Sequence, residues 1–162
     1  MSDPTNDERL TTAGLFLETH AGLVTALERQ FARDVPEVSL HSFEVLIRLA
    51  RSPGARLRMS DLAAQVAMSP SGLTRAVDRL EANGLVERAS CPSDGRGSFA
   101  VLTPAGRALV DRAVPLHLEH LEEHFTGLLN ADELRRFSAT LRKLRDHLNP
   151  TAAQVTTPGP AT

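Results

Sequence analysis

The sequence predicts a mainly α-helical domain with one small β-hairpin. Apolar residues recur at helical spacing along most of the 162-residue chain. Ser, Thr or Asn precedes several of these segments, where such side chains cap helices, and Pro or Gly follows others, where helices end. One stretch, 85–102, instead has two short β-type runs around a cluster of turn residues. These patterns predict the order α-α-α-α-β-β-α-α.

Composition places the chain among soluble globular proteins, with 41% apolar and 23% charged residues. No apolar run approaches the ~20 residues that cross a bilayer, and the acidic N-terminus does not match a secretory signal. The single cysteine, Cys91, excludes an intramolecular disulfide and a cysteine-based zinc finger. We therefore expect a cytoplasmic protein with no membrane partner.

The charge is unevenly distributed along the chain, whose formal net charge is -2. Segment 51–112 holds nine arginines and six acidic residues, whereas acidic residues predominate in the remainder. A basic centre between acidic ends suggests that a polyanion contacts the middle of the chain.

Flexible tails are expected at 1–8 and at 150–162, the latter with three prolines and no charge. The first two helices are expected over about 9–33 and 40–51, since each apolar pattern stops shortly before a proline. The segment 9–149 is thus predicted to be a single domain.

The centre of the chain has the pattern of two short helices joined by a tight turn. Ser60 is predicted to cap a helix over 60–67. Ser69 is predicted to cap a second helix that begins with Pro70 and ends at Asn83 and Gly84. Followed by the hairpin, these helices predict a winged helix-turn-helix, with a DNA-binding lobe over about 38–103.

Two further helices are expected after the hairpin. One is capped by Thr103 and runs from Pro104 to about 126 with a bend at Pro115, and the other begins at Asn130, with Glu133 as its capping-box partner. The last helix carries a narrow apolar seam, spaced 3, 4, 3 and 4: Leu134, Phe137, Leu141, Leu144 and Leu148. The seam either packs on the chain's own first helix or pairs with a second subunit. We favour a homodimer through helices at about 9–33 and 104–148.

The N-terminal end of the second helix of such a unit meets base edges in the major groove. Small residues at Ser71 and Gly72 allow close approach, and Ser71 and Thr74 can form hydrogen bonds with bases or phosphates. Arg75 has the reach for a guanine, whereas Arg79 and the Ser69 cap suit phosphates. Taken singly, each of these side chains is also an ordinary cap or a solvated arginine.

The hairpin tip adds a second set of candidate DNA contacts. Arg96, between two glycines, can project into a minor groove, where negative potential is concentrated. Asp94 either pairs with an arginine of the same unit or forms an Asx-turn. Arg88 is predicted to contact a phosphate.

Three segments resemble the MarR family of bacterial transcription regulators: Ser-Pro-Ser-Gly-Leu-Thr-Arg-Ala-Val-Asp-Arg-Leu-Glu-Ala-Asn-Gly-Leu-Val-Glu-Arg at 69–88, Asp-Gly-Arg-Gly at 94–97 and Val-Leu-Thr-Pro-Ala-Gly at 101–106. The resemblance implies a dimer that binds palindromic double-stranded DNA operators, usually as a repressor released by a small ligand or an oxidant. It also implies a role for each matching position: base contacts for Ser71, Thr74 and Arg75, phosphate contacts for Ser69 and Arg88, minor-groove insertion for Arg96 and support of the wing for Asp94.

The resemblance leaves the effector open. Members of the family sense anionic aromatic compounds or oxidants, and a few sense zinc through histidines on the helix after the hairpin. Here that helix carries three histidines at i, i+3 and i+7, which suit either a metal or a solvated face: His117, His120 and His124. Cys91 is either a redox switch at the wing or a bystander thiol. His20 and His41 either line a ligand pocket or simply pack.

The sequence does not support catalysis. It contains no Gly-rich phosphate loop, no nucleophile elbow and no HExxH motif, so we expect neither an enzyme nor a bound cofactor. The alternative from another class is a winged-helix module that binds protein rather than DNA. Salt dependence separates the two, because DNA affinity falls steeply with salt as counterions are released.

Overall fold

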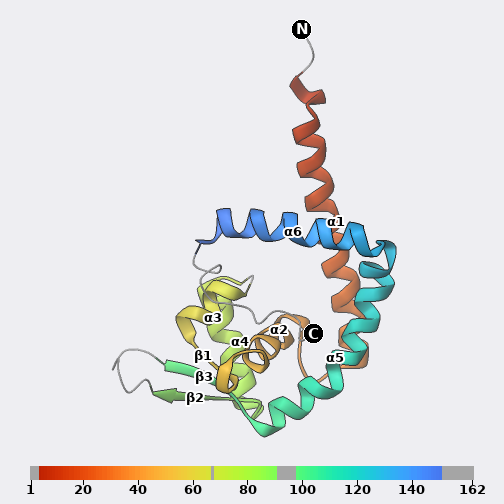
Figure 1. Ribbon diagram of the computed structural model, residues 1–162. Helices are drawn as coiled ribbons and strands as arrows, with labels where there is room; N and C mark the ends of the chain where they lie inside the picture. Colours follow the sequence, from red (N-terminus) through yellow and green to blue (C-terminus); the bar gives the residue numbers. More distant parts are fainter. Residues whose placement is uncertain (1–3, 67, 91–97, 151–162) are drawn as a thin grey trace.

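A computed structural model confirms the mainly helical architecture (Figure 1). The structure describes residues 4–66, 68–90 and 98–150. The helices are α1 (Glu8–Asp34), α2 (Leu40–Ala50), α3 (Met59–Gln65), α4 (Pro70–Ala82), α5 (Pro104–His124) and α6 (Ala131–Leu148), and the strands are β1 (Arg56–Arg58), β2 (Val86–Ser90) and β3 (Ser98–Leu102). Short 3-10 turns occupy Pro4–Asn6, Pro53–Ala55 and Thr126–Leu128.

Helices α2, α3 and α4 pack with the three strands into one lobe, called the helix-turn-helix lobe below. Its centre is α2, whose Phe43, Leu46 and Leu49 are fully buried. Val77 on α4 and Ala100 on β3 pack into the same core. Burying each large apolar side chain contributes about 1.5–3 kcal/mol, so this core fixes the position of α4 relative to the sheet.

The sheet is antiparallel with the order β1-β3-β2. The β2–β3 hairpin confirms the predicted wing strands, whereas β1 was not predicted. Three residues are too few for an alternating pattern to stand out. The strand depends on tertiary pairing instead: Leu57 lies opposite Ala100, and both side chains are buried.

Strand β1 also corrects the predicted start of α3. The helix begins at Met59, and its N-cap is Arg58 in an extended conformation, so Ser60 lies inside the first turn and is not the cap. Pairing of Arg58 with Phe99 holds the chain extended up to that residue, so the helix begins at the next one.

The other three helices extend away from the lobe (Figure 1). Helix α5 runs beside the C-terminal half of α1, while the N-terminal half of α1 projects beyond the rest of the chain and α6 crosses it. Within α5, Pro115 cannot donate a backbone hydrogen bond, and the helix changes direction along its length. The predicted capping box is present at the start of α6, between Asn130 and Glu133. None of the described helices is long and apolar enough to span a membrane.

Candidate nucleic-acid interface

Helix α4 separates its side chains into a buried and an exposed face. Leu73, Ala76, Val77 and Leu80 point into the lobe. The predicted contact residues Ser71, Thr74, Arg75 and Arg79 are all exposed on the opposite side. The spacing of the two sets follows the helical period, so the four polar residues form one surface that a ligand can contact.

The N-terminus of α4 is capped as predicted. The hydroxyl oxygen of Ser69 accepts a hydrogen bond from the backbone N–H of Gly72, at 3.1 Å, and lies 3.3 Å from the hydroxyl of Ser71. A Cβ built on Gly72 would lie 3.1 Å from the same Ser69 oxygen, so a side chain there would crowd the cap. The N–H groups of Gly72 and Leu73 already donate to Ser69, and Pro70 has no N–H, so it is chiefly the positive end of the helix dipole that suits a phosphate here.

The polar side chains of α4 differ in whether they already form hydrogen bonds within the chain. The Thr74 hydroxyl donates to the carbonyl of Pro70 at 3.0 Å. The Arg79 Nε donates to the carbonyl of Arg75 at 3.2 Å, so this guanidinium lies back along the helix. The Arg75 side chain forms no hydrogen bond or ion pair within the described ranges and is free to reach a base edge.

Arg88 on β2 has contacts that the sequence did not predict. Its Nη1 lies 2.7 Å from an Asp78 oxygen and 2.9 Å from a Glu81 oxygen, and its backbone N–H donates to Glu81. The hydrogen bond to Asp78 is the main cause that raises the pKa of Arg88. The guanidinium thus joins β2 to α4 and neutralises two acidic groups beside the proposed DNA surface, and its phosphate contact stays a prediction.

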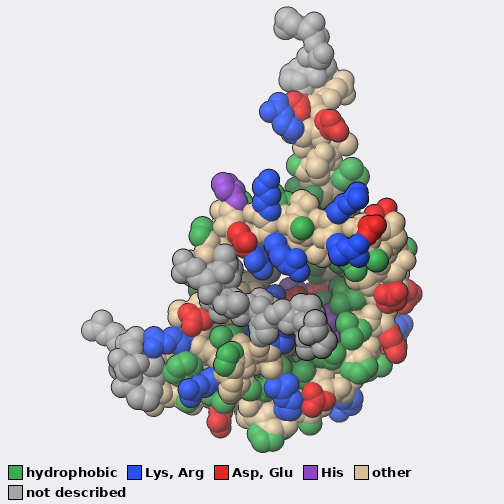
Figure 2. Space-filling view, viewed as in Figure 1, with side chains coloured by type: hydrophobic (Ala, Val, Ile, Leu, Met, Phe, Trp, Pro, Cys, Tyr) green, Lys and Arg blue, Asp and Glu red, His purple; other side chains and the backbone are tan. Residues whose placement is uncertain are grey.

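Two more arginines lie at the base of the wing. Arg56 and Arg58 on β1 stack on the ring of Phe99, with guanidinium carbons 5.1 and 5.8 Å from its centroid. Basic side chains are visible on the lobe and along α6 in Figure 2. The remaining wing candidates, Asp94 and Arg96, lie outside the described residues, as does Cys91.

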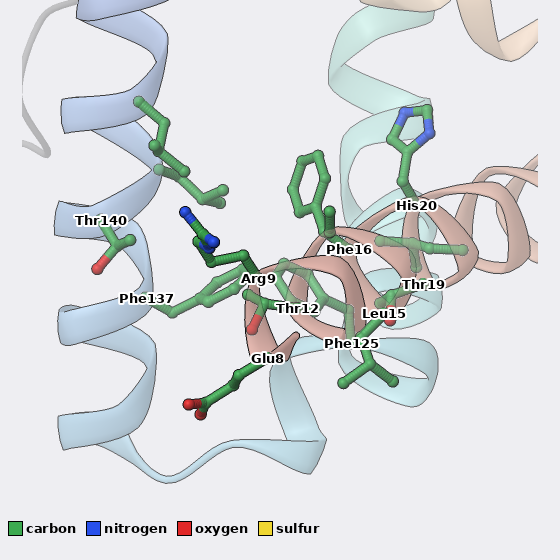
Figure 3. Close-up of a pocket in the computed structure, with 14 residues that line it drawn as sticks. Glu8, Arg9, Thr12, Leu15, Phe16, Thr19, His20, Phe125, Phe137 and Thr140 are labelled. Atoms are coloured by element: carbon green, nitrogen blue, oxygen red, sulfur yellow. The ribbon is translucent and has the colours of Figure 1, made fainter. Parts of the chain in front are cut away.

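A long apolar groove lies between the N-terminal half of α1 and helix α6 (Figure 3). It encloses about 990 Å³, and its walls include Phe16 and His20 of α1 and Phe137, Leu141 and Leu144 of α6. No described residue of α6 is buried. Three of the five residues of the predicted seam, Phe137, Leu141 and Leu144, line this groove, and none of the five is buried against the chain's own first helix.

The three histidines of α5 occupy different environments. His120 is buried, and its Nε2 lies 2.8 Å from an Asp34 carboxylate oxygen, a hydrogen bond that lowers the pKa of Asp34. His117 meets the rings of Phe31 and Phe43 edge-on, and burial lowers its pKa. His124 lies 3.9 Å from its neighbour Glu123. Among the residues that the structure describes, no group of three or more His, Cys, Asp or Glu could hold a metal ion.

Comparisons with family models, with curated proteins and with solved structures agree on one family. The MarR family model matches residues 37–97. The HTH-type transcriptional repressor Rv2887 of Mycobacterium tuberculosis is 31% identical over 129 residues, which cover 80% of this chain and 91% of that protein. The structure of Sco3205, a MarR family transcriptional regulator from Streptomyces coelicolor in complex with DNA, is 33% identical with a TM-score of 0.80, covering 88% of this chain and 92% of that one.

A third relative is BpsR of Bordetella bronchiseptica, whose DNA binding is regulated by 6-hydroxynicotinic acid. It is 25% identical with a TM-score of 0.73, covering 84% of this chain and 99% of that one. The helix-turn-helix lobe, the exposed polar face of α4 and the extent of these matches agree with one another. The chain belongs to the MarR family of transcriptional regulators.

Proposed function

We propose that this chain is a homodimeric repressor that binds a palindromic operator and is released by a small anionic aromatic ligand. The exposed face of α4 carries this proposal: two arginines, two hydroxyl side chains and a capped, open N-terminus lie on one side of a helix that the core holds in place. Such a helix fits the major groove, where Arg75 can form two hydrogen bonds with a guanine. Arg79 and the Ser69 end of the helix would hold the flanking phosphates.

The dimer is supported by the groove between α1 and α6. Leu15 and Phe16 of α1 are 59% and 50% exposed, and Leu144 of α6 is 47% exposed. Large apolar side chains that gather on two helices around a groove mark a protein interface. A second copy presents the same two helices. A twofold arrangement would therefore bury the exposed apolar side chains of α1 and α6 in both copies.

The effector is inferred from a relative. BpsR, whose structure resembles this chain, is a protein whose DNA binding is regulated by 6-hydroxynicotinic acid, a small aromatic acid. An effector of that class releases DNA if it binds more tightly to a dimer whose two α4 helices no longer match the operator spacing. An oxidant acting through Cys91 is the alternative, whereas the described α5 histidines belong to no group that could hold zinc.

The first test is a gel-shift titration on the DNA directly upstream of the coding region, at two salt concentrations and with scrambled DNA as competitor. We expect specific binding whose affinity falls steeply as salt rises. If that DNA is not bound, selection from random sequences supplies the operator. Failure to select any sequence would favour the protein-binding module instead.

The same probe tests the effector. Phenolic and nicotinic acids, zinc and peroxide are each added to the protein–DNA complex. Release by an aromatic acid supports the proposal, whereas release only by zinc or only by peroxide would assign the metal or the thiol mechanism.

A further inference from the structure

The first turn of α5 is bonded directly to the end of α4. The hydroxyl of Thr103 accepts a hydrogen bond from the backbone N–H of Gly106 at 3.0 Å, which caps α5. The same hydroxyl donates to the carbonyl of Gly84 at 2.7 Å. A hydroxyl has one proton to donate, and here that proton goes to a residue nineteen positions earlier in the chain.

Gly84 directly follows Asn83, the C-cap of α4. Its φ is +68°, and the backbone N–H groups of Gly84 and Leu85 donate to the carbonyls of Glu81 and Leu80, each at 2.9 Å. This pair of bonds is the Schellman ending of a helix. Thr103 therefore bonds to the residue that closes the C-terminal end of the helix that presents the proposed DNA contacts.

The two segments also approach closely through their backbones. A Cβ built on Gly106 would lie 2.1 Å from the carbonyl oxygen of Leu85, a distance that real Cβ atoms essentially never show. The backbone N–H of Thr103 donates to the same carbonyl at 3.2 Å. Only glycine at 106 lets the first turn of α5 lie against the connection between α4 and β2.

A third bond ties the same turn to α2. The Arg107 Nη2 donates to the carbonyl of Ala50, the last residue of α2, at 3.0 Å. Because the donor is charged and the contact is partly buried, this bond is stronger than a neutral one. The start of α5 thus bonds to the C-terminal ends of both α2 and α4.

The far end of α5 packs on α1, where His120 meets Asp34 and Glu123 accepts a hydrogen bond from Gln30. Helix α5 therefore connects the helix-turn-helix lobe to the helices of the proposed dimer. Its 21 residues span roughly 30 Å, so a tilt of about 6° at one end moves the other by about 3 Å, close to the rise of one base pair.

We propose that Thr103, Gly106 and Arg107 form a junction that sets the angle between α4 and α5, and thereby the separation of the two α4 helices in the dimer. They are positioning residues that touch no DNA. The inference rests on the proposed function, since the spacing of two half-sites matters only to a dimer that binds both.

The test compares operators that differ only in the spacer between their half-sites. The operator is the one that the wild-type protein selects from random DNA, and the variants carry one base pair more or less. Thr103→Asp keeps an N-cap acceptor for Gly106 but has no proton for Gly84, so it removes the side-chain bond to Gly84 without removing the cap. Thr103→Ser keeps both bonds. Ser39→Ala, which removes the cap of α2, controls for a general loss of stability.

We expect Thr103→Asp to reduce the preference for the native spacer by about threefold to tenfold, the factor that one hydrogen bond is worth. Its affinity for random DNA and its salt dependence should match the wild type. Thr103→Ser and Ser39→Ala should both retain the wild-type spacer preference.

Two results would contradict these proposals, and each would overturn a different one. A Thr103→Asp protein with the wild-type spacer preference would overturn the junction while leaving the regulator intact. A wild-type protein that selects no sequence, or binds all spacers equally, would overturn the proposed function itself.

Discussion

Arg75 is the exposed side chain of α4 whose guanidinium has no bond to another described residue. We predict that Arg75→Ala costs about 1–3 kcal/mol of binding free energy on the selected operator and less on random DNA, because a bidentate contact to guanine distinguishes sequences. Competition titrations on both DNAs measure the difference.

Arg142→Ala is the matched control for that change, since it removes one exposed arginine from α6. It should leave the operator preference as it is. An equal loss on both DNAs after Arg75→Ala would make Arg75 a phosphate anchor.

Arg88 illustrates how one side chain can support a DNA surface without touching it. We predict that Arg88→Gln lowers the free energy of unfolding by about 0.5–1 kcal/mol, the value of a well-placed surface pair, and weakens operator binding because Asp78 and Glu81 lose their counter-charge. Urea unfolding and gel-shift titration measure the two effects.

A double-mutant cycle separates the two roles of Arg88. If it neutralises Asp78, then Asp78→Asn raises DNA affinity more in the Arg88→Gln protein than in the wild type. Equal gains, with a salt slope lower by about 1 after Arg88→Gln, would instead support the phosphate contact predicted from the sequence.

At the scale of the elements, the packing of α5 on α1 and α2 gives stability a pH dependence. Burial lowers the pKa of His117 below its ordinary value of about 6.5, so the unfolded chain binds more protons than the folded chain as the pH falls below that value. The free energy of unfolding is therefore expected to be lower at about pH 5.5 than at about pH 7.5.

We predict that His117→Gln removes part of this pH dependence, because the buried imidazole is then absent. His147→Gln, at the exposed end of α6, is the control and should retain it. Urea midpoints at the two pH values measure the effect, and identical pH slopes in the wild type and in His117→Gln would contradict it.

Local chemistry explains which elements could be predicted from the sequence. Ser69, Thr103 and Asn130 cap the helices that they were expected to cap, because a cap depends on neighbours within three residues. The exposed face of α4 was predicted for the same reason, since a helical period alone divides its residues.

The features that the sequence did not predict depend on distant partners. Strand β1 exists because Leu57 pairs with Ala100, and that pairing also displaces the start of α3 from Ser60. The contacts of Arg88 with α4 follow from the placement of β2 beside that helix. Neither partner can be located from spacing along the chain.

At the scale of the whole molecule, α6 and the first half of α1 are predicted to hold two copies together. We predict that Leu141→Glu converts the dimer to a monomer, because it places a charge in the apolar groove. Operator affinity should then fall by about a hundredfold or more, since the two half-sites are no longer bound together. Sedimentation velocity and gel shift measure the two effects.

Ala139→Glu is the matched control, as residue 139 lies on the side of α6 away from the seam. That protein should remain dimeric. If both variants sediment alike, the seam is not the interface.

The uncovered seam of α6 also bears on how long a chain survives before it meets a partner. Helix α6 has no fully buried side chain in the single chain and is held by its caps and by few tertiary contacts, such as that of Phe137 with Phe125, so we expect it to fray in water. Frayed segments are preferred sites of proteolytic cleavage. We expect newly made chains to be degraded faster when they are scarce than when they are abundant, so the amount of active regulator should rise more steeply than gene dosage.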